Sequence, residues 1–386
     1  WVPINKGGAY RRHYGNYEYV INIYDLWNRQ EKVNVSVRRS EPEFYFKKAL
    51  NWSATTMGGS SFRITNNKTS STAAPSLYFK NDDDLYVSLA LLNSCISQVY
   101  MDLLNPTVGL KLANVEAVPA INFEKMAVFL RSSCENNIAL SKEDWDSYEI
   151  SWDFEQHPLV KRKELHSLEK CYLTWKTECE NRFLKMKDNE EHINVVILKE
   201  YGLENEVSCE VPEKSISVHR IFDTKEDIPV SMDGSYYVRT KRDEIVSLIS
   251  YSVGCMFGRY SLDKKGIVNA GAPLNVNEYV SFSVDKDNII PICDDEYFKD
   301  DIVGRFVEFI KIVYGADSLD DNLTFIAKAL GGKGSPREII RNYFVNDFYK
   351  EHCATYSGTV GKRPIYWLFD AGKNNSFKAL IYMHRY

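Results

Sequence analysis

The sequence predicts an α+β fold built from three successive parts. Its first 80 residues combine short alternating runs, such as "YEYVINIY" and "SLYF", with many Gly, Asn, Ser and Thr residues, which is typical of strands joined by loops. Beyond them, long segments carry apolar residues at helical spacing. We therefore expect a mixed strand, loop and helix domain over residues 1–135, a helical spacer over 136–215 and a mainly α-helical domain over 216–386.

Composition is that of an ordinary globular protein with one uneven feature. Of the 386 residues, 44% are hydrophobic and 26% are charged, and the net charge is −5. Residues 1–80, however, hold twelve Lys and Arg against five Asp and Glu. We therefore expect a local basic surface in an otherwise acidic protein, which keeps nucleic-acid binding open.

Cysteine spacing and hydropathy bear on the cellular compartment, on metal binding and on membrane association. The eight cysteines form no C-x-x-C pair, which favours a reducing cytoplasm and predicts no metal site. No apolar run approaches the roughly 18 residues of a membrane span, so no membrane partner is expected.

The elements follow from periodicity and from helix-ending residues. A first helix is predicted from Asp84 to Leu104, and Pro106 ends it by forcing Asn105 out of the helical region. A second helix is expected over 122–135, and Ser141–Asp144 resembles a capping box.

Further helices are predicted in the rest of the chain. A long, highly charged helix is expected from 159 to 201, with Gly202 as its C-cap. Three more segments carry an apolar face at helical spacing, over residues 241–262, 294–315 and 335–353. Ser335, Pro336 and Glu338 supply an N-cap, a first-turn proline and a capping-box acid. Two strand-like runs, 363–370 and 377–386, close the chain about a "GKNNS" turn.

Motifs for catalysis are not evident in the sequence. "GGKGS" at 331–335 follows a helix and misplaces the Lys and Ser of a phosphate loop, so we interpret it as a C-cap joined to an N-cap. "DTK" at 223–225 lacks the partner acid of a nuclease motif and is interpreted as a solvated turn. We assign no catalytic, cofactor-binding or metal-binding residues.

Three basic clusters in the first 80 residues favour DNA binding. "NKGGAYRRHYGN", an Arg-Arg pair and "GGSSFRITNNKTS" combine a flexible backbone with arginine and asparagine, the side chains suited to phosphates and to guanine and adenine edges. Each cluster alone is more typical of a solvated loop, and only the three together, in one basic domain, make DNA binding an equal alternative. The DNA-binding residues predicted from them are Lys6, Arg11, Arg12, Arg38, Arg39, Arg63, Asn66, Asn67 and Lys68.

Several long strings resemble a known family. "WVPINKGGAYRRHYGNYEYVIN", "GGSSFRITNNKTSSTAAPSLYF" and "LLNSCISQVYMDLLNPTVGLKLANVEAVP" are similar to the target-recognition region of adenine-specific DNA methyltransferases. "NEEHINVVILKEYGL" and "KRPIYWLFDAGKNNSFKALIYMHRY" resemble the PglX-like members of BREX phage-defence systems, which are related to Type IIG enzymes. The resemblance covers essentially the whole chain and implies that the helix ending at Asn105 closes a DNA-recognition fold.

The chain departs from the family in its catalytic motifs. These enzymes carry a glycine motif for S-adenosylmethionine and an [N/D]-P-P-[Y/F] tetrapeptide that grips a flipped adenine. This chain has no Pro-Pro pair and no G-x-G after a strand. We therefore expect the catalytic domain to lie upstream, and the chain alone to bind no cofactor and to transfer no methyl group.

The resemblance implies sequence recognition and duplex clamping for a site-specific N6-adenine DNA methyltransferase in phage defence. S-adenosylmethionine would serve the full-length enzyme, and double-stranded DNA would be the partner. One alternative is a protein-interaction module that docks other phage-defence proteins or a phage inhibitor. Another is the specificity part of a Type IIG restriction-modification enzyme.

Overall fold

The chain groups into two compact units. The structure, a computed structural model, describes residues 1–24, 42–56, 59–105, 107–120, 124–356, 364–372 and 377–385. Unit 1 comprises Trp1–Trp145, Cys179–Arg220 and Ile228–Val238, and unit 2 comprises Asp146–Glu178, Ile221–Asp227 and Arg239–Tyr386. Helices and several small sheets together confirm the predicted α+β class. The division into domains 1–135, 136–215 and 216–386 stays a prediction.

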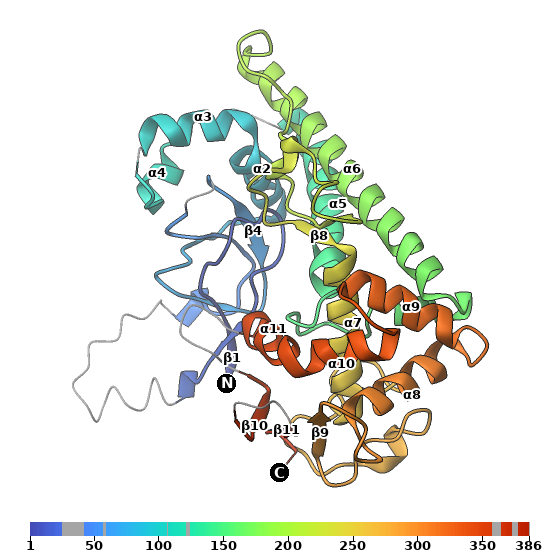
Figure 1. The fold of residues 1–386 in the computed structure, drawn as a ribbon. Helices are drawn as coiled ribbons and strands as arrows, with labels where there is room; N and C mark the ends of the chain where they lie inside the picture. Colours follow the sequence, from blue (N-terminus) through green and yellow to red (C-terminus); the bar gives the residue numbers. More distant parts are fainter. Residues whose placement is uncertain are drawn as a thin grey trace. The chain divides into compact units, whose positions relative to one another are not determined.

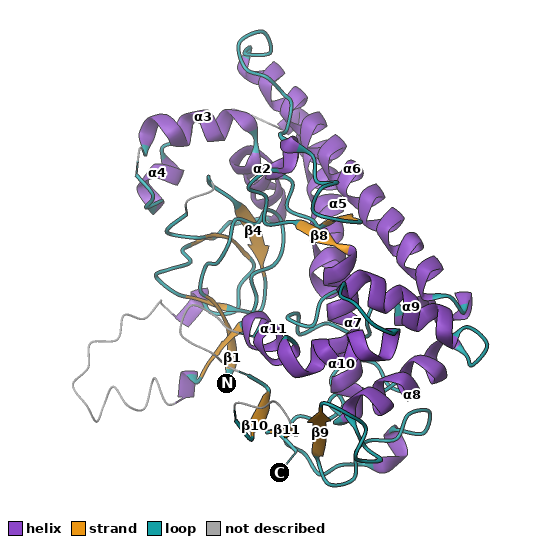
Figure 2. Ribbon diagram, viewed as in Figure 1, coloured by secondary structure: helices purple, strands orange, loops and turns teal. Residues whose placement is uncertain are grey.

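Unit 1 begins with short strands joined by long loops (Figure 2). One sheet has the order β2-β1-β5, formed by Tyr19–Ile21, Val2–Asn5 and Thr69–Ser70. The second has the order β4-β3-β6, formed by Phe62–Thr65, Ala49–Trp52 and Ser76–Leu77. Strands β3 and β4 are antiparallel, with Asn51 opposite Arg63. Residues at alternate positions therefore share one face of this sheet.

One face of the β3–β4 pair forms the core of unit 1. Leu50, Trp52, Phe62 and Ile64 pack in one hydrophobic cluster with helix α2 (Asp82–Asn93). Residues of α5 (Ala127–Asp146) and of the second half of α6 (Leu168–Tyr201) complete this cluster. The opposite face of β3 and β4 carries polar side chains, and it is the face that positions the candidate site.

The helix predicted from Asp84 to Leu104 is divided at Ser94. Helix α2 ends at Asn93 and α3 (Cys95–Leu104) follows at an angle of 70°. The Ser94 hydroxyl accepts a hydrogen bond from Ser97 N and donates one to Leu91 O, so it ends one helix and caps the next. The predicted end of the helix at Asn105 is confirmed. Helix α4 (Leu112–Glu116) lies beside α3 (Figure 1).

The capping box predicted at Ser141–Asp144 is wrong. Both residues lie within α5, which runs from Ala127 to Asp146 and extends well beyond the predicted end at 135. The Ser141 hydroxyl contacts the carbonyl oxygen of Arg12 at 3.5 Å, and the Asp144 carboxylate accepts from His219 N at 2.9 Å. Partners distant in sequence, rather than a helix start, therefore explain these two polar residues.

The long charged helix predicted from 159 to 201 is interrupted near its start. A 3-10 turn at Val160–Leu165 ends at His166, whose φ of 53° is left-handed, and α6 then runs from Leu168 to Tyr201. The predicted C-cap is confirmed, because Gly202 has a φ of 68° and its N–H donates to Lys199 O at 3.2 Å. The first part of α6 belongs to unit 2 and its second part to unit 1.

Unit 2 is mainly helical, as the sequence predicts. Helices α8 and α9 pack against α7, and α10 packs against both α8 and α9 (Figure 1). Its elements are α7 (Lys241–Met256), β9 (Ile289–Cys293), α8 (Ile302–Tyr314), α9 (Leu319–Leu330), α10 (Pro336–Asn346), α11 (Phe348–Thr355), β10 (Tyr366–Asp370) and β11 (Phe377–Tyr382). Strand β7 (Arg220–Phe222) pairs with β8 (Val238–Thr240).

Several local predictions in unit 2 are confirmed, and two are corrected. Ser335 caps α10 with Glu338 in a capping box and Pro336 in the first turn, while Gly331 caps the end of α9. Strands β10 and β11 pair antiparallel, and the turn between them lies largely outside the described residues. The helix predicted from 294 begins only at Ile302, because Asp301 is its N-cap. The helix predicted over 335–353 is divided at Asp347.

Candidate nucleic-acid interface

Arg11 lies inside unit 1 rather than on its surface. Its guanidinium stands 4.8 Å from the ring centre of Trp145 and 4.9 Å from that of Tyr237. Its Nη1 atom lies 3.5 Å from the carboxylate of Asp144, and only 5% of the residue is exposed. Gly15, with a φ of 124°, is needed here, because a Cβ at this position would overlap the Arg11 side chain. Two aromatic rings and a carboxylate therefore enclose this cation.

Arg12 and His13 share one buried carboxylate on α6. Arg12 Nη1 lies 2.6 Å from Glu190 Oε2, and His13 Nε2 lies 2.8 Å from Glu190 Oε1. Burial raises the pKa of Glu190, but Arg12 and His13 outweigh it and hold the pKa below its ordinary value. This ion pair attaches the N-terminal segment of unit 1 to α6.

Asp144 connects a second set of buried groups. Its carboxylate lies 2.9 Å from His219 Nδ1, 3.5 Å from Arg11 and 4.0 Å from Arg182. Burial raises the pKa of Asp144, but the three neighbouring cationic or donor groups outweigh that effect and hold the pKa well below its usual range. The predicted "RRH" cluster therefore has internal partners for its charges.

Arg63 is also buried, on the polar face of β4. Only 1% of the residue is exposed, and its Nη2 atom donates to Ser53 Oγ at 3.4 Å. Burial lowers the pKa of Arg63 to about 10, and the nearby Arg11 cation adds to this effect, against Tyr17 and Tyr237. Because pH 7 lies far below that value, the side chain is charged at neutral pH.

Three lysines of unit 1 lie over tyrosine rings of one short segment. Strand β1 pairs with both β2 and β5, which brings Lys6, just after β1, and Lys68, just before β5, to the same small sheet. The lysine nitrogens stand 4.0 to 5.1 Å from the ring centres in the pairs Lys6–Tyr19, Lys68–Tyr17 and Lys142–Tyr14. We call these six residues the lysine–tyrosine group. Lys6 is exposed, while Lys68 and Lys142 are half-buried.

Sequence reasoning found two of these three lysines and missed Lys142. That residue lies on α5, far from the basic clusters in the sequence, and it sits in a charged helical stretch that carries no signal of its own. Its position over the Tyr14 ring comes from the packing of α5 on the N-terminal segment.

Asn66 and Asn67 project from a tight turn between β4 and β5. Both are exposed, and Asn67 adopts a left-handed φ of 54°, which asparagine tolerates better than most residues. Asn67 N donates to Phe46 O at 3.2 Å, and Lys68 Nζ donates to Asn66 O at 3.3 Å. The turn is thus held through its backbone, while its two amide side chains face solvent. Arg38 and Arg39, also predicted to bind DNA, lie outside the described residues.

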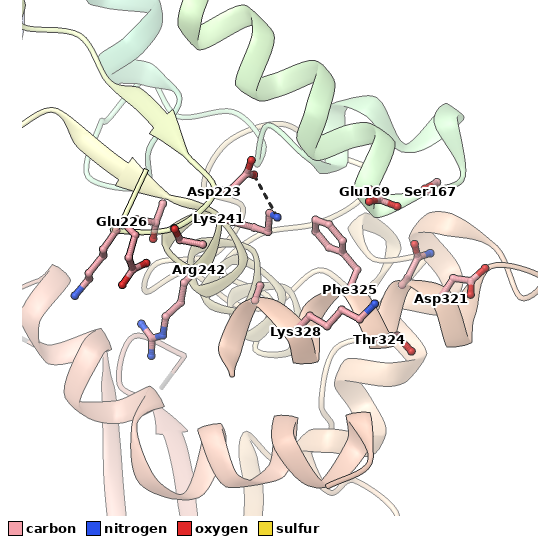
Figure 3. A pocket seen from close by; sticks show the side chains of 15 residues that line it. Ser167, Glu169, Asp223, Glu226, Lys241, Arg242, Asp321, Thr324, Phe325 and Lys328 are labelled. Carbon is pink, nitrogen blue, oxygen red and sulfur yellow. Dashed lines mark ion pairs between the residues drawn. The ribbon is translucent and has the colours of Figure 1, made fainter. Parts of the chain in front are cut away.

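A hollow of about 750 Å³ lies in unit 2 (Figure 3). The N-terminal end of α7 supplies Lys241 and Arg242, and α9 supplies Phe325 and Lys328. Four basic and four acidic side chains line it, namely Lys225, Lys241, Arg242 and Lys328 with Glu169, Asp223, Glu226 and Asp321. Charge alone therefore favours neither an anion nor a cation.

Asp223, the acid of the "DTK" string, is engaged by neighbouring side chains. Its carboxylate accepts from Lys176 Nζ at 2.8 Å and from the Tyr172 hydroxyl at 2.9 Å, and Lys241 Nζ lies 3.2 Å away. Lys176, with Tyr172 and Lys241, lowers the pKa of Asp223 to about 2. These contacts give Asp223 a structural role, while Thr224 and Lys225 are exposed, as expected for the solvated turn predicted from this string.

One group of carboxylates in the described residues could hold a cation. Ligand atoms of Asp285, Asp287 and Asp300 lie within 4.8 Å of one another in unit 2. Burial and the neighbouring Asp287 raise the pKa of Asp285. Exposed acidic side chains commonly gather without a metal, and we assign none to this group.

Among the described residues, no single helix is long and apolar enough to cross a membrane. Helices α2 and α3 reach that length and composition together, but they are bent by 70° and most residues of α2 are buried in the core of unit 1.

Comparison with known proteins places the chain in a family. It is 37% identical over 405 residues to the adenine-specific methyltransferase PglX of Lacticaseibacillus casei (strain Zhang). It is 32% identical over 403 residues to the adenine-specific methyltransferase BrxX of Escherichia coli O9:H4 (strain HS). All of this chain is matched in both cases, while it spans 31% and 32% of those proteins. No family model matches the chain.

A two-unit α+β chain whose N-terminal segment places tyrosine rings under three lysines is thus related over its full length to adenine-specific methyltransferases. The chain is a PglX-like sequence and corresponds to about a third of the length of these relatives. The resemblance detected in the sequence is confirmed.

Proposed function

We propose that unit 1 recognises double-stranded DNA for a site-specific N6-adenine methyltransferase of a cytoplasmic phage-defence system. The observation that carries the proposal is the exposed turn of Asn66 and Asn67. Two amide side chains project beside Lys68, in a chain related over its whole length to adenine-specific methyltransferases. Amides of this kind can bond both N6 and N7 of adenine in the major groove.

The charges of the proposed surface come from lysines rather than from the arginine pair. Lys6 and Lys68 are exposed or half-buried, whereas Arg11 and Arg12 are enclosed by aromatic rings and carboxylates. A tyrosine ring under an ammonium fixes the nitrogen in place, and the exposed ammonium can still donate to a phosphate oxygen. We therefore assign phosphate contact to the lysine–tyrosine group and positioning of the loops to Arg11 and Arg12.

Methyl transfer itself is assigned to no residue of this chain. Neither the cofactor motif nor the adenine-gripping tetrapeptide occurs in its 386 residues, and S-adenosylmethionine would serve the full-length enzyme. This chain then contributes selection of the target sequence and binding of the duplex, while another part of the full-length enzyme methylates the flipped adenine.

The phosphate assignment is tested by salt dependence in the full-length enzyme. Lys6→Ala/Lys68→Ala should lower the slope of log affinity against log salt by about 0.9 for each lost phosphate contact, on all duplex sequences alike. Lys185→Ala/Lys199→Ala removes the same charge from the exposed face of α6 and serves as the matched control. Equal slopes for both double variants would refute the assignment.

Base readout is tested by the methylated sequence. Asn67→Gly removes the amide but keeps the left-handed turn, which Asn67→Ala would strain. Asn66→Ala and Asn67→Gly should each relax the methylated motif at one base, since a good bidentate contact discriminates by about 1–3 kcal/mol. An unchanged motif at unchanged efficiency for both variants would make the turn a scaffold.

A second candidate function, docking of another defence protein or a phage inhibitor, is favoured by one observation. Helices α3 and α4 and the segment between them expose a set of apolar side chains, namely Val99, Leu103, Leu104, Val108 and Leu112. Exposed apolar residues gathered in this way often mark protein interfaces. Binding that is insensitive to salt and lost on Leu103→Glu would favour this function.

A further inference from the structure

A buried polar layer lies on the face of the β3–β4 pair that points away from the core. Side chains at alternate positions of a strand share a face of the sheet. One face of the β3–β4 pair therefore carries the apolar Leu50, Phe62 and Ile64. The other face carries the polar Asn51, Arg63 and Thr65. Asn5 of β1 reaches this layer, because its amide donates to Thr65 Oγ1 at 2.9 Å. All four polar residues are almost completely buried.

Arg63 differs from the other buried arginines of unit 1 in its surroundings. Arg11, Arg12 and Arg182 each have a carboxylate within 4.0 Å, but among the described residues no carboxylate forms an ion pair with Arg63. Its Nη1 atom is buried without a hydrogen-bond partner, and its contact to Ser53 Oγ is long, at 3.4 Å.

Within the part of the chain that the structure describes, the charge of Arg63 thus has no carboxylate partner. The Coulombic neighbours of its guanidinium include a second cation, Arg11, together with the phenols of Tyr17 and Tyr237. Burial of an unpaired ion is strongly unfavourable unless an opposite charge arrives. A neutral aliphatic side chain would cost less in the free protein, so this arrangement points to an anionic ligand.

A hydrogen-bonded chain through Ser53 connects Arg63 to the glycine turn at Gly7–Gly8. Ser53 Oγ, the acceptor for Arg63, donates in turn to the carbonyl of Gly8 at 3.1 Å. Gly8 is exposed, and Gly7 packs so closely that a Cβ would stand 2.8 Å from Ala73 O. Both glycines have positive φ, at 78° and 134°, and such residues can rearrange at little steric cost. The buried cation is therefore linked through Ser53 to a turn whose second glycine is exposed, and Lys6 precedes that turn.

We propose that Arg63 is a phosphate-binding residue, which a DNA phosphate reaches when the Gly7–Gly8 turn moves aside. This inference rests on the proposed function and deepens it. A phosphate fits better than a guanine edge, because only the phosphate supplies the missing negative charge. Lys6, exposed at the start of the turn, would bind the same or the adjacent phosphate.

The test compares stability with DNA affinity for Arg63→Met in the full-length enzyme. Removal of an uncompensated charge should leave the thermal unfolding midpoint unchanged or raised. The same change should weaken binding of a duplex at least tenfold and lower the salt slope by about one. Arg11→Met is the matched control, because that arginine has a carboxylate partner and its loss should lower the midpoint. A lowered midpoint with unchanged affinity for Arg63→Met would make Arg63 a structural residue and overturn the proposal.

A measurement on the unmodified enzyme covers the case in which Arg63→Met fails to fold. Hydrogen–deuterium exchange with and without a saturating duplex should change at residues 6–9 and 62–64. Binding of the duplex with no change in either segment would overturn the inference and leave the proposed function intact. An unmodified enzyme that binds no duplex even at low salt would instead refute the proposed function.

Discussion

Substitution of Arg12 by alanine should destabilise unit 1 rather than simply remove a DNA contact. The Arg12–Glu190 pair is short, at 2.6 Å, and its side chains are only 10% and 5% exposed. Alanine would leave the Glu190 carboxylate buried, with His13 as its one remaining ion-pair partner among the described residues. Loss of one partner from a buried pair costs roughly 3–5 kcal/mol. For a unit of this size, each kcal/mol lowers the unfolding midpoint by about 2–4 °C, so a decrease of about 6–20 °C is expected.

Differential scanning calorimetry or circular dichroism of the chain would measure this decrease. Arg131→Ala is the matched control, because Arg131 makes an ion pair of 2.7 Å with Asp83 in the same unit but its side chain is 41% exposed. Solvent screens such a pair, and the midpoint of Arg131→Ala should stay close to that of the unmodified chain. Arg12→Ala/Glu190→Gln should recover part of the loss, since the buried charge is then gone. Equal midpoints for Arg12→Ala and Arg131→Ala would refute the reasoning.

The pH dependence of the same pair has a definite sign. The pKa of Glu190 is lower in the folded chain than its ordinary value of 4.5. Its contribution to stability is therefore complete above 4.5 and is lost as the pH falls through the folded-state pKa. The difference in midpoint between the unmodified chain and Arg12→Ala should accordingly narrow in acid. A difference that stays constant down to pH 3 would exclude an electrostatic origin.

Two further predictions concern other parts of the chain. Burial lowers the pKa of His157 and His352 from 6.5 to about 3, and both rings accept backbone hydrogen bonds. Unit 2 should therefore lose stability as the pH falls from 6.5 toward 3. His352→Gln should flatten that pH dependence, and thermal unfolding at pH 7 and pH 5 would check it. The isolated chain should bind no S-adenosylmethionine and methylate no DNA, and micromolar binding in a calorimetric titration would contradict this expectation.

Local rules predicted the elements whose causes are local. The capping box of Ser335 and Glu338 spans a single turn, and the end of α3 at Asn105 follows from the proline next to it. The apolar stripes of α7 and α8 and the β10–β11 hairpin likewise depend on spacing within a few residues. In each case the deciding interaction lies within the sequence window from which it is read.

The partners of the charged side chains, by contrast, could not be predicted from neighbouring residues in the sequence. Arg12 and Glu190 are 178 residues apart in sequence, and His13 is 177 residues from the same carboxylate. Nothing beside "YRRHYG" indicates that acids of α5 and α6 will enclose these cations. The same holds for Ser141 and Asp144, whose partners Arg12 and His219 lie in distant segments.

The sequence by itself determined the α+β class, most of the helices and the membership in the PglX-like family, because periodicity, caps and long similar strings are properties of contiguous residues. Only the tertiary structure decided which basic residues face solvent. It buried Arg11, Arg12 and Arg63 and left Lys6, Asn66 and Asn67 exposed. For Arg11 and Arg12 the fold brings a carboxylate to the buried charge, and that partner is selected by packing and not by its position in the sequence.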